Sequence, residues 1–284
     1  MTSRSAGARV TALAVAWVLA AAMAAAQSET WSPPRTSDGQ PDIQGFWTQR
    51  GLTIPTYSLE DGPPLDHATI IGQALQVNRP SAVVDPPDGR APYQPWAAAQ
   101  RKAVFDNHND LKLRNQMDPQ DRCFLGGPTR FFSLGNIQIL QSPGYVVLLN
   151  EFAHAFRTVP LDARPRLGET VKLWQGDSRG RWEGNTLVIE TTNSNDKTWF
   201  DKIGSFHSDS MRLTERLTLV NATTLSYRAT VDDPLVFTRP WTIGLTLGPV
   251  DGSSQGFELI EQACYEGDAF GREVFATLKG QVAR

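Results

Sequence analysis

From about Ile137 onward, apolar and polar residues alternate with a period of two, and this pattern constrains the fold more than any other feature. Turn residues such as Ser142-Pro143-Gly144 separate the alternating runs. Successive side chains of a strand point to opposite faces, so each run indicates a strand with one buried face. Because no helices intervene, the pattern predicts a mainly β fold, an antiparallel barrel or sandwich, with a lipocalin-like barrel as one option. The expected strands are 137–140, 145–152, 185–192, 211–220, 224–232, 241–247 and 257–264.

The preceding part of the chain is rich in proline. More than half of the 19 prolines lie between residues 27 and 95, and proline pairs do not fit inside helices or central strands. We therefore expect an extended segment that wraps over the barrel through anchors such as Trp47 and Trp96. One helix should follow, from near Pro95 to near Asn107, and a second is expected over 268–278. Residues 27–135 and 136–284 should form one structural domain.

The first 26 residues have the features of a secretory signal peptide. Arg4 and Arg9 precede an almost wholly apolar run that ends in Ala24-Ala25-Ala26, the usual small-residue cleavage signal. A membrane anchor is the alternative, but the run is short for a span and no cationic stop follows it. The sequence thus predicts a periplasmic or secreted protein that begins at Gln27 after cleavage.

The net charge limits the classes of binding partner, and the cysteine content indicates the redox state of the thiols. The formal net charge is −3 at pH 7, and the predicted leader carries two of the arginines. No long basic run exists, which disfavours nucleic acid and anionic membranes as partners. Cys123 and Cys264 are the two cysteines, and in an oxidising compartment an even pair favours one disulfide. Two buried thiols are the alternative.

Three glutamates fall on strand faces whose other members are apolar: Glu151, Glu215 and Glu261. A carboxylate in a dry core costs several kcal/mol unless it is paired. Arg157 and Arg239 are available as partners. Two interpretations remain open: inward ion pairs that fix strand register, or a polar-lined barrel pocket in which a glutamate with a raised pKa acts as general acid or base.

Other chemistry-bearing motifs are few. The chain has four histidines, and neither they nor the cysteines show metal-ligand spacing, so we expect no metal site. Nucleophile and nucleotide-binding motifs are also missing, so we expect no cofactor. His207 lies in a loop just before the Glu215 strand, where a histidine could carry protons at a barrel mouth. A lone surface histidine is an equally good interpretation.

The stretch WQGDSRGRWEGNTLVIETTN, residues 174–193, resembles a large family of exported bacterial proteins, most of them without an assigned function, that are common in soil and aquatic Gram-negative species. The resemblance covers nearly the whole mature chain and implies secretion and one shared domain. Where the family pattern is Cys-His-Glu-Gly-Asn, this chain has Cys264-Tyr265-Glu266-Gly267-Asp268, so Tyr265 would replace the histidine. Further matching segments are PDIQGFW (41–47), VDPPDGRAPYQPWA (84–97), RCFLGGPTR (122–130), TERLTLV (214–220), VDDPLVFTRPWT (231–242) and EQACYEGD (261–268).

Two functions from different classes follow. The first is an exported, cofactor-free lyase, isomerase or hydrolase that acts on a small oxygenated molecule by general acid–base catalysis in a barrel pocket. The second is a periplasmic small-molecule binding protein without catalysis, whose tryptophans line or cap a cavity. For the enzyme we expect the catalytic residues Glu215, Glu261, His207 and Tyr265. The expected substrate-binding residues are Glu151, Arg157, Trp182, Arg239 and Trp241.

Overall fold

The computed structural model describes residues 31–50, 58–60, 80–107, 118–251 and 256–263. The predicted leader, the predicted helix over 268–278, Cys264 and Tyr265 lie outside these residues. From Pro33 onward the described residues belong to one compact unit. Its elements are β1 (Gly45–Arg50), β2 (Val83–Asp85), α3 (Pro95–Asn107), η2 (Pro119–Arg122), α4 (Gly127–Arg130), β3 (Ile137–Ser142), β4 (Tyr145–Asn150), β5 (Phe156–Pro160), β6 (Asp177–Glu183), β7 (Thr186–Thr192), β8 (Arg212–Asn221), β9 (Thr224–Asp232) and β10 (Trp241–Pro249).

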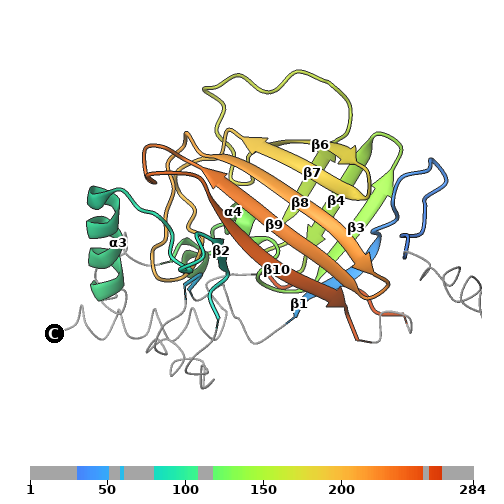
Figure 1. Ribbon diagram of the computed structural model, residues 1–284, viewed down its shortest axis with the longest axis horizontal. Helices are drawn as coiled ribbons and strands as arrows, with labels where there is room; N and C mark the ends of the chain where they lie inside the picture. Colours follow the sequence, from blue (N-terminus) through green and yellow to red (C-terminus); the bar gives the residue numbers. More distant parts are fainter. Residues whose placement is uncertain (1–30, 51–57, 61–79, 108–117, 252–255, 264–284) are drawn as a thin grey trace, which may run out of the picture. The chain divides into compact units, whose positions relative to one another are not determined.

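Ten antiparallel strands form one sheet that curls into a nearly closed barrel, which confirms the mainly β class (Figure 1). Paired neighbours follow the order β5-β4-β3-β1-β10-β9-β8-β7-β6, and β2 pairs with β10. Strand β1 therefore lies between β3 and β10, so the proline-rich segment supplies a central strand and does more than wrap. It can do so because no proline interrupts the run from Gly45 to Arg50.

The barrel closes where β5 and β6, the two ends of the sheet, come together. Gly180 makes this approach possible, because a Cβ atom built on it would lie 2.7 Å from Val159 Cγ1 and 2.8 Å from Leu161 Cδ2. Any side chain at position 180 would push the two strands apart. A two-residue turn, Gly184-Asn185, joins β6 to β7, with Gly184 at a φ of +58°.

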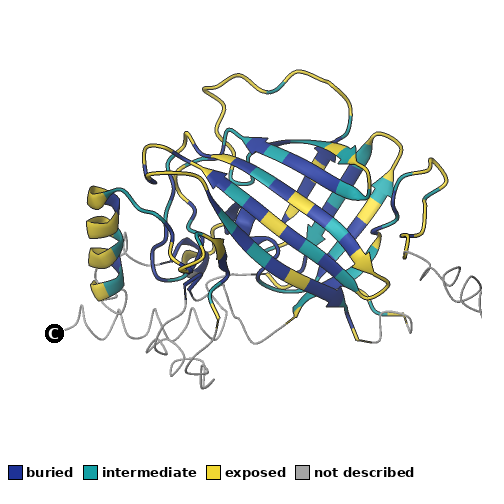
Figure 2. Cartoon of the chain, in the orientation of Figure 1, coloured by how far each residue is buried: buried dark blue, intermediate teal, exposed yellow. Residues whose placement is uncertain are grey.

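Alternation places the core inside the barrel (Figure 2). On β8, Leu213, Glu215 and Leu217 are buried while Arg212 and Arg216 are exposed, as the parity argument predicted. On β4 the prediction was wrong. Val146 and Leu148 are fully buried, whereas Leu149 on the expected face is only partly so. Both faces of β4 are apolar in sequence, so parity alone could not select the inward one.

Two further expectations need correction. No strand covers residues 257–263, where a single bridge joins Gln262 to Phe152. Phe257 instead packs edge-on against Phe46 of β1, with ring centroids 5.1 Å apart. The helix α3 forms as predicted, but its Trp96 is 52% exposed and contacts Phe206 rather than burying in the barrel. An alanine-rich helix offers little apolar surface that would pull Trp96 inward.

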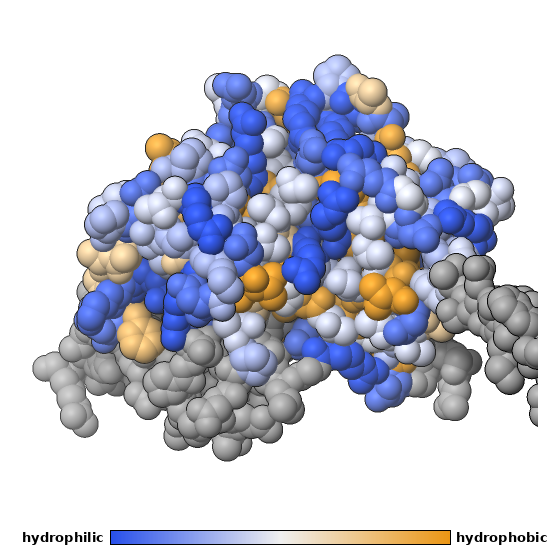
Figure 3. Space-filling model, viewed as in Figure 1, coloured by the Kyte–Doolittle hydropathy of each residue, from blue (hydrophilic) through white to orange (hydrophobic). Residues whose placement is uncertain are grey.

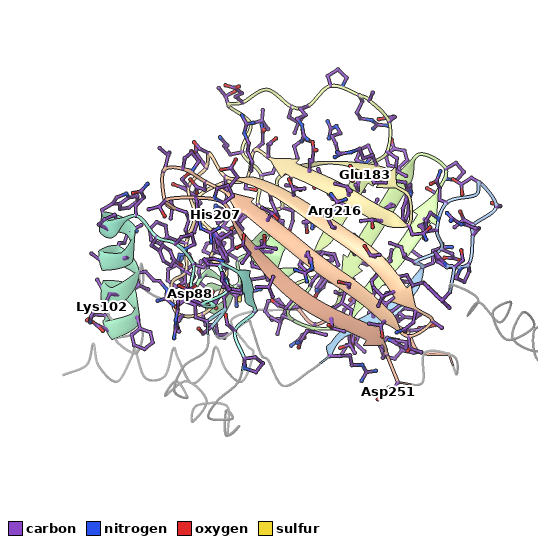
Figure 4. The ribbon with its side chains drawn as sticks, in the orientation of Figure 1. Asp88, Lys102, Glu183, His207, Arg216 and Asp251 are labelled. Atoms are coloured by element: carbon purple, nitrogen blue, oxygen red, sulfur yellow. The ribbon has the colours of Figure 1, made fainter. Side chains whose placement is uncertain are left out.

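Ion pairs cover the outer face of β6 to β8. Arg181 bonds both Glu183 and Glu190, and Arg216 bonds Glu183 at 2.6 Å. Figure 4 shows Glu183 and Arg216 on this face, and Figure 3 shows how polar side chains dominate it. Val188 points outward between Arg181 and Arg216 but is fully buried. Long arginine stems can cover such an apolar residue while their charged ends stay in water.

One end of the barrel is plugged by the segment that contains η2 and α4. Asp118 accepts a hydrogen bond from the main-chain N–H of Gln120 and so caps η2. All four residues of α4 are buried. The chain then sends Phe132 into the interior, where its ring lies 4.4 Å from that of Tyr227 on β9. In Figure 1, α4 accordingly lies behind β9.

Candidate functional site

An ion pair between β5 and β8 lies inside the barrel. Arg157 donates to both carboxylate oxygens of Glu215, at 2.9 and 2.5 Å. The hydroxyl of Tyr227 donates to the same carboxylate at 3.0 Å. The side chains of Arg157 and Glu215 are only 1% and 0% exposed. The predicted partnership of an inward glutamate with Arg157 is therefore confirmed.

The hydroxyl groups of Ser178 and Thr191 complete this network. Each accepts a hydrogen bond from Arg157 Nη2 at 3.2 Å, and the two lie 2.9 Å from one another. Because Ser178 belongs to β6 and Thr191 to β7, one guanidinium ties β5 to three strands across the closing seam. A buried charge is tolerated only when it is paired and hydrogen-bonded in this way.

Arg157 and Tyr227 both keep their protons in this network. Burial lowers the pKa of Arg157, but the Glu215 carboxylate raises it by more, so the guanidinium stays charged. Burial and the same carboxylate raise the pKa of Tyr227 well above its usual value, so its phenol stays protonated. A general acid or base needs a pKa near the working pH. The geometry thus fits the structural interpretation of Glu215.

The other residues expected beside Glu215 are not brought to it. Glu261 is exposed and lies in the segment that forms no strand, so the shared cavity predicted for the two glutamates is absent from the described residues. Arg239 is also exposed and bonds Asp85 at 3.3 Å, which excludes it as the counter-charge of Glu215. Both errors arose because parity says which face a side chain occupies, but not which residues meet on that face.

His207 is buried, not at a rim as predicted. It lies in the loop before β8, on the α3 side of the barrel (Figure 4). Its Nδ1 faces the main-chain carbonyl of Ser208 at 2.8 Å, so Nδ1 donates and Nε2 accepts from the hydroxyl of Thr198 at 2.7 Å. Burial lowers the pKa of His207. The ring is therefore a neutral internal connector.

The other residues expected to bind substrate contact other parts of the protein. Glu151 is buried because its carboxylate accepts from the main-chain N–H of Asn136 at 2.9 Å. Trp241 is fully buried among aromatic rings, including Phe200 and Phe237. Trp182 is partly buried and packs on the core. The structure places none of these three in the pocket described next.

A narrow pocket opens beside α4, at the plugged end of the barrel. It has an empty volume of about 250 Å³, open solvent included, and the enclosed part has room for about one water-sized group. Its walls come from the segment around α4, from the end of β4 and the turn after it, and from the loop before β6. The lining residues are Gln120, Leu125, Gly126, Gly127, Arg130, Phe131, Leu134, Asn150, Phe152, Ala153, Ala155 and Gln175.

Most polar groups in the pocket wall are engaged within the protein. Arg130 donates to both oxygens of Asp118, at 2.7 and 3.0 Å, and both side chains are about 1% exposed. The amide nitrogen of Asn150 donates to the carbonyls of Phe131 and Leu134, and its oxygen accepts from a main-chain N–H. The Oε1 atom of Gln175 differs. It is buried and has no hydrogen-bond partner within the described part of the chain.

Glycines set the positions of the pocket walls. Gly127 has a φ of +81°, and a Cβ built on it would lie 2.6 Å from Thr198 Oγ1. Gly176, next to Gln175, has a φ of +67°, and its Cβ would lie 2.4 Å from Thr191 Cγ2. Both backbones therefore approach neighbouring segments more closely than any other residue allows. These glycines fix where Gln175 and α4 sit.

Two aromatic residues, Phe124 and Trp174, adjoin lining residues in the chain. Phe124, next to the lining residue Leu125, stacks on Trp174 with ring centroids 5.0 Å apart and planes 11° from parallel. Arg122 lies over the Phe124 ring at 5.3 Å. Phe124 is 42% exposed. Phe131 lines the pocket and also lies 5.9 Å from the Arg157 guanidinium, so it stands between the pocket and the interior ion pair.

The sequence does not predict this pocket, although the segments that build it carry the family resemblance. Residues 122–130, with the pair Gly126-Gly127, and residues 174–176, with Gln175 before Gly176, both belong to the stretches on which the family resemblance rests. Adjacent glycines outside a hairpin signal close backbone approach. Nothing in the sequence, however, shows that the two segments meet.

No family model matches the chain, and neither a curated protein nor a solved structure is detectably similar to it. In the described residues, no three His, Cys, Asp or Glu side chains gather so as to hold a metal ion. Within the same residues, no helix is both long and apolar enough to traverse a bilayer.

Proposed function

We propose that this protein binds a small amphipathic molecule at the pocket beside α4, without transforming it. The observation that carries the proposal is the contrast within that pocket. Its walls include the apolar side chains of Leu125, Phe131, Leu134 and Phe152, and they also hold a buried acceptor, Gln175 Oε1, that the described protein leaves unbonded. Mostly apolar walls with few convergent polar groups are typical of ligand sites.

Binding is better supported than catalysis. Among the described lining residues none is Asp, Glu, His, Cys, Lys or Tyr, and the guanidinium of Arg130 is held by Asp118. General acid–base chemistry needs a titratable group within hydrogen-bond reach of the ligand. A lyase, isomerase or hydrolase therefore remains the second hypothesis, and it would need catalytic groups from outside the described lining.

We also propose that the protein is exported and that it belongs to the family it resembles. The basic start, apolar run and alanine-rich cleavage signal support a periplasmic or secreted location. The measurement is the intact mass of the protein recovered from the periplasm of a Gram-negative host. A mass equal to that of a chain beginning at Gln27 supports export. An uncleaved chain found only in the cytoplasm contradicts it.

The binding proposal is tested by blocking the pocket. Phenol serves as the probe, and its binding is measured by ligand-observed NMR. Leu125→Trp enlarges a lining side chain so that it fills the pocket, and it should abolish saturable binding. Leu140→Trp is the matched control, because Leu140 is 40% exposed on β3 and does not line the pocket. Equal binding by both variants, or none by the unmodified protein, would overturn the proposal.

A further inference from the structure

We propose that the outer face of β3, β4 and β5 is a docking surface for a segment of the same chain, residues 268–278, which packs there as an amphipathic helix. The role of this face does not depend on the function proposed for the pocket. Three observations carry the proposal: a sheet face without charge, the place where the described chain ends, and the apolar pattern of the segment that follows.

The outer face of these three strands carries no charged residue. A sheet face that meets water is normally polar, and the outer face of β6 to β8 accordingly holds ion pairs such as Arg216–Glu183. The composition of the β3–β5 face instead indicates that it is covered in the folded protein. Its outward residues are Gln138, Leu140, Ser142, Tyr145, Val147, Leu149, Phe156, Thr158 and Pro160.

Four apolar side chains adjoin one another on this face. Leu140 of β3 lies opposite Val147 of β4, and Leu149 of β4 lies opposite Phe156 of β5. Opposite residues and their diagonal neighbours are close enough to touch, so the four form one continuous surface, the β3–β5 patch. Leu140 is 40% exposed and Phe156 is 64% exposed. Continuous exposed apolar surface marks an interaction site.

The described chain ends beside this patch. The main-chain N–H of Ala153 donates to the carbonyl of Gln262 at 2.9 Å, and the N–H of Gln262 donates to the carbonyl of Glu151 at 3.2 Å. Glu151 and Ala153 belong to the turn between β4 and β5, which Leu149 and Phe156 flank. The part of the chain that follows Gln262 therefore starts next to the patch.

That part of the chain has a matching apolar pattern. The sequence predicts a helix over 268–278, and residues four apart in a helix share a face. Phe270, Val274 and Leu278 fall on one side by this spacing, whereas Arg272 falls on the other. An amphipathic helix gains most of its stability from packing its apolar face on another surface.

The dimensions of the helix and the patch agree. Residues 264–267 reach at most about 14 Å when fully extended, so a helix that starts at Asp268 begins near the β4–β5 turn. A helix over 268–278 is about 16 Å long, and a strand of the length of β4 extends about 20 Å. A second copy of the chain would also cover the patch, but it would leave the apolar face of 268–278 to be buried elsewhere.

The experiment measures hydrogen–deuterium exchange of the full chain by mass spectrometry. In the unmodified protein the amides of 268–278 should exchange slowly, because a docked helix keeps its main-chain hydrogen bonds. Phe156→Asp and, separately, Leu140→Asp place a charge in the patch and should each speed this exchange by at least about tenfold. Val220→Asp is the matched control, because Val220 is 49% exposed on β8, outside the patch. Both patch residues are exposed, so β9 should stay protected in every variant.

The proposal is supported if the protein is a monomer in which 268–278 loses protection only in the two patch variants. Fast exchange of 268–278 in the unmodified protein would overturn it, as would protection that neither patch variant removes. Equal acceleration in Val220→Asp would also overturn it. Light scattering after size exclusion tests the second copy, because a dimer that Phe156→Asp dissociates would mean that another chain, and not residues 268–278, covers the patch.

Discussion

Arg157 and Glu215 are separated by 58 residues in the chain, yet each terminal nitrogen of the arginine bonds one oxygen of the carboxylate inside the barrel. The pair joins β5, one end of the sheet, to β8. Since Arg157 also bonds Ser178 on β6, the same residue bridges the seam where the barrel closes. Glu215, which the sequence offered as a catalytic acid or base, therefore forms an ion pair that holds strands of the barrel together.

Removing the charge of Glu215 should destabilise the protein. In Glu215→Gln the amide cannot compensate Arg157, so the free energy of unfolding in urea should fall by about 3–5 kcal/mol. The control is Glu183→Gln, which breaks ion pairs on the exposed outer face and should change stability little. Phenol binding by the folded fraction of the Glu215 variant should be unchanged. Wild-type stability with lost binding would contradict the structural role.

Adding a methyl group at Gly180 should strain the seam. Gly180→Ala places a Cβ within 2.7 Å of Val159 Cγ1, and such overpacking typically costs about 1–3 kcal/mol. The control is Gly168→Ala, because a Cβ at Gly168 meets nothing within 4 Å. Thermal unfolding followed by circular dichroism measures both. If the two variants melt alike, β5 and β6 are not closely packed at Gly180.

His207 should make stability depend on pH. Burial lowers its pKa in the folded protein below the usual value of about 6.5, so the unfolded chain binds protons more readily. Stability is then complete above pH about 6.5 and declines as the pH falls through that value toward the folded pKa.

The measurement is urea unfolding across this pH range. His207→Gln should flatten the decline, whereas His154→Gln should not, because His154 is exposed. An identical pH slope in the wild type and the His207 variant would mean that the ring titrates as it does in water.

The Cys123–Cys264 disulfide stays a prediction, because Cys264 lies outside the described residues. The geometry nearby is favourable. Leu125, two residues after Cys123, lines the same pocket as Ala153, whose main-chain N–H donates to Gln262. Gln262 is in turn two residues before Cys264. Thiol titration of the denatured, unreduced protein should find no free sulfhydryl, and two free thiols would contradict the bridge.

The fold class followed from the sequence because strand parity is a local property. Residues 224–232 form a strand with the predicted limits, and the buried face of β8 is the predicted one. Strand β1 was missed because its neighbours in sequence are prolines and its partners, β3 and β10, are remote. Local pattern cannot tell a central strand from an extended wrapping segment.

The candidate site was less predictable. Parity identified Glu215 as inward, and Arg157 as an available partner, because a buried carboxylate must be paired. The pocket is lined both by Gln175 and by the Gly126-Gly127 segment, which are far apart in sequence. Neither residue type attracts notice alone, since a glutamine and a glycine pair are ordinary loop residues.

The most direct test of this account asks where a ligand touches the protein. In ¹⁵N-labelled protein, tryptophan indole N–H signals give well-separated probes, and Trp174→Phe identifies the signal of Trp174, which directly precedes the lining residue Gln175. On titration with phenol, that signal should shift with saturation, while those of Trp182 and Trp241, which lie away from the pocket, should stay in place. Shifts of the Trp182 or Trp241 signals with none at Trp174 would contradict the account and return the site to the barrel interior.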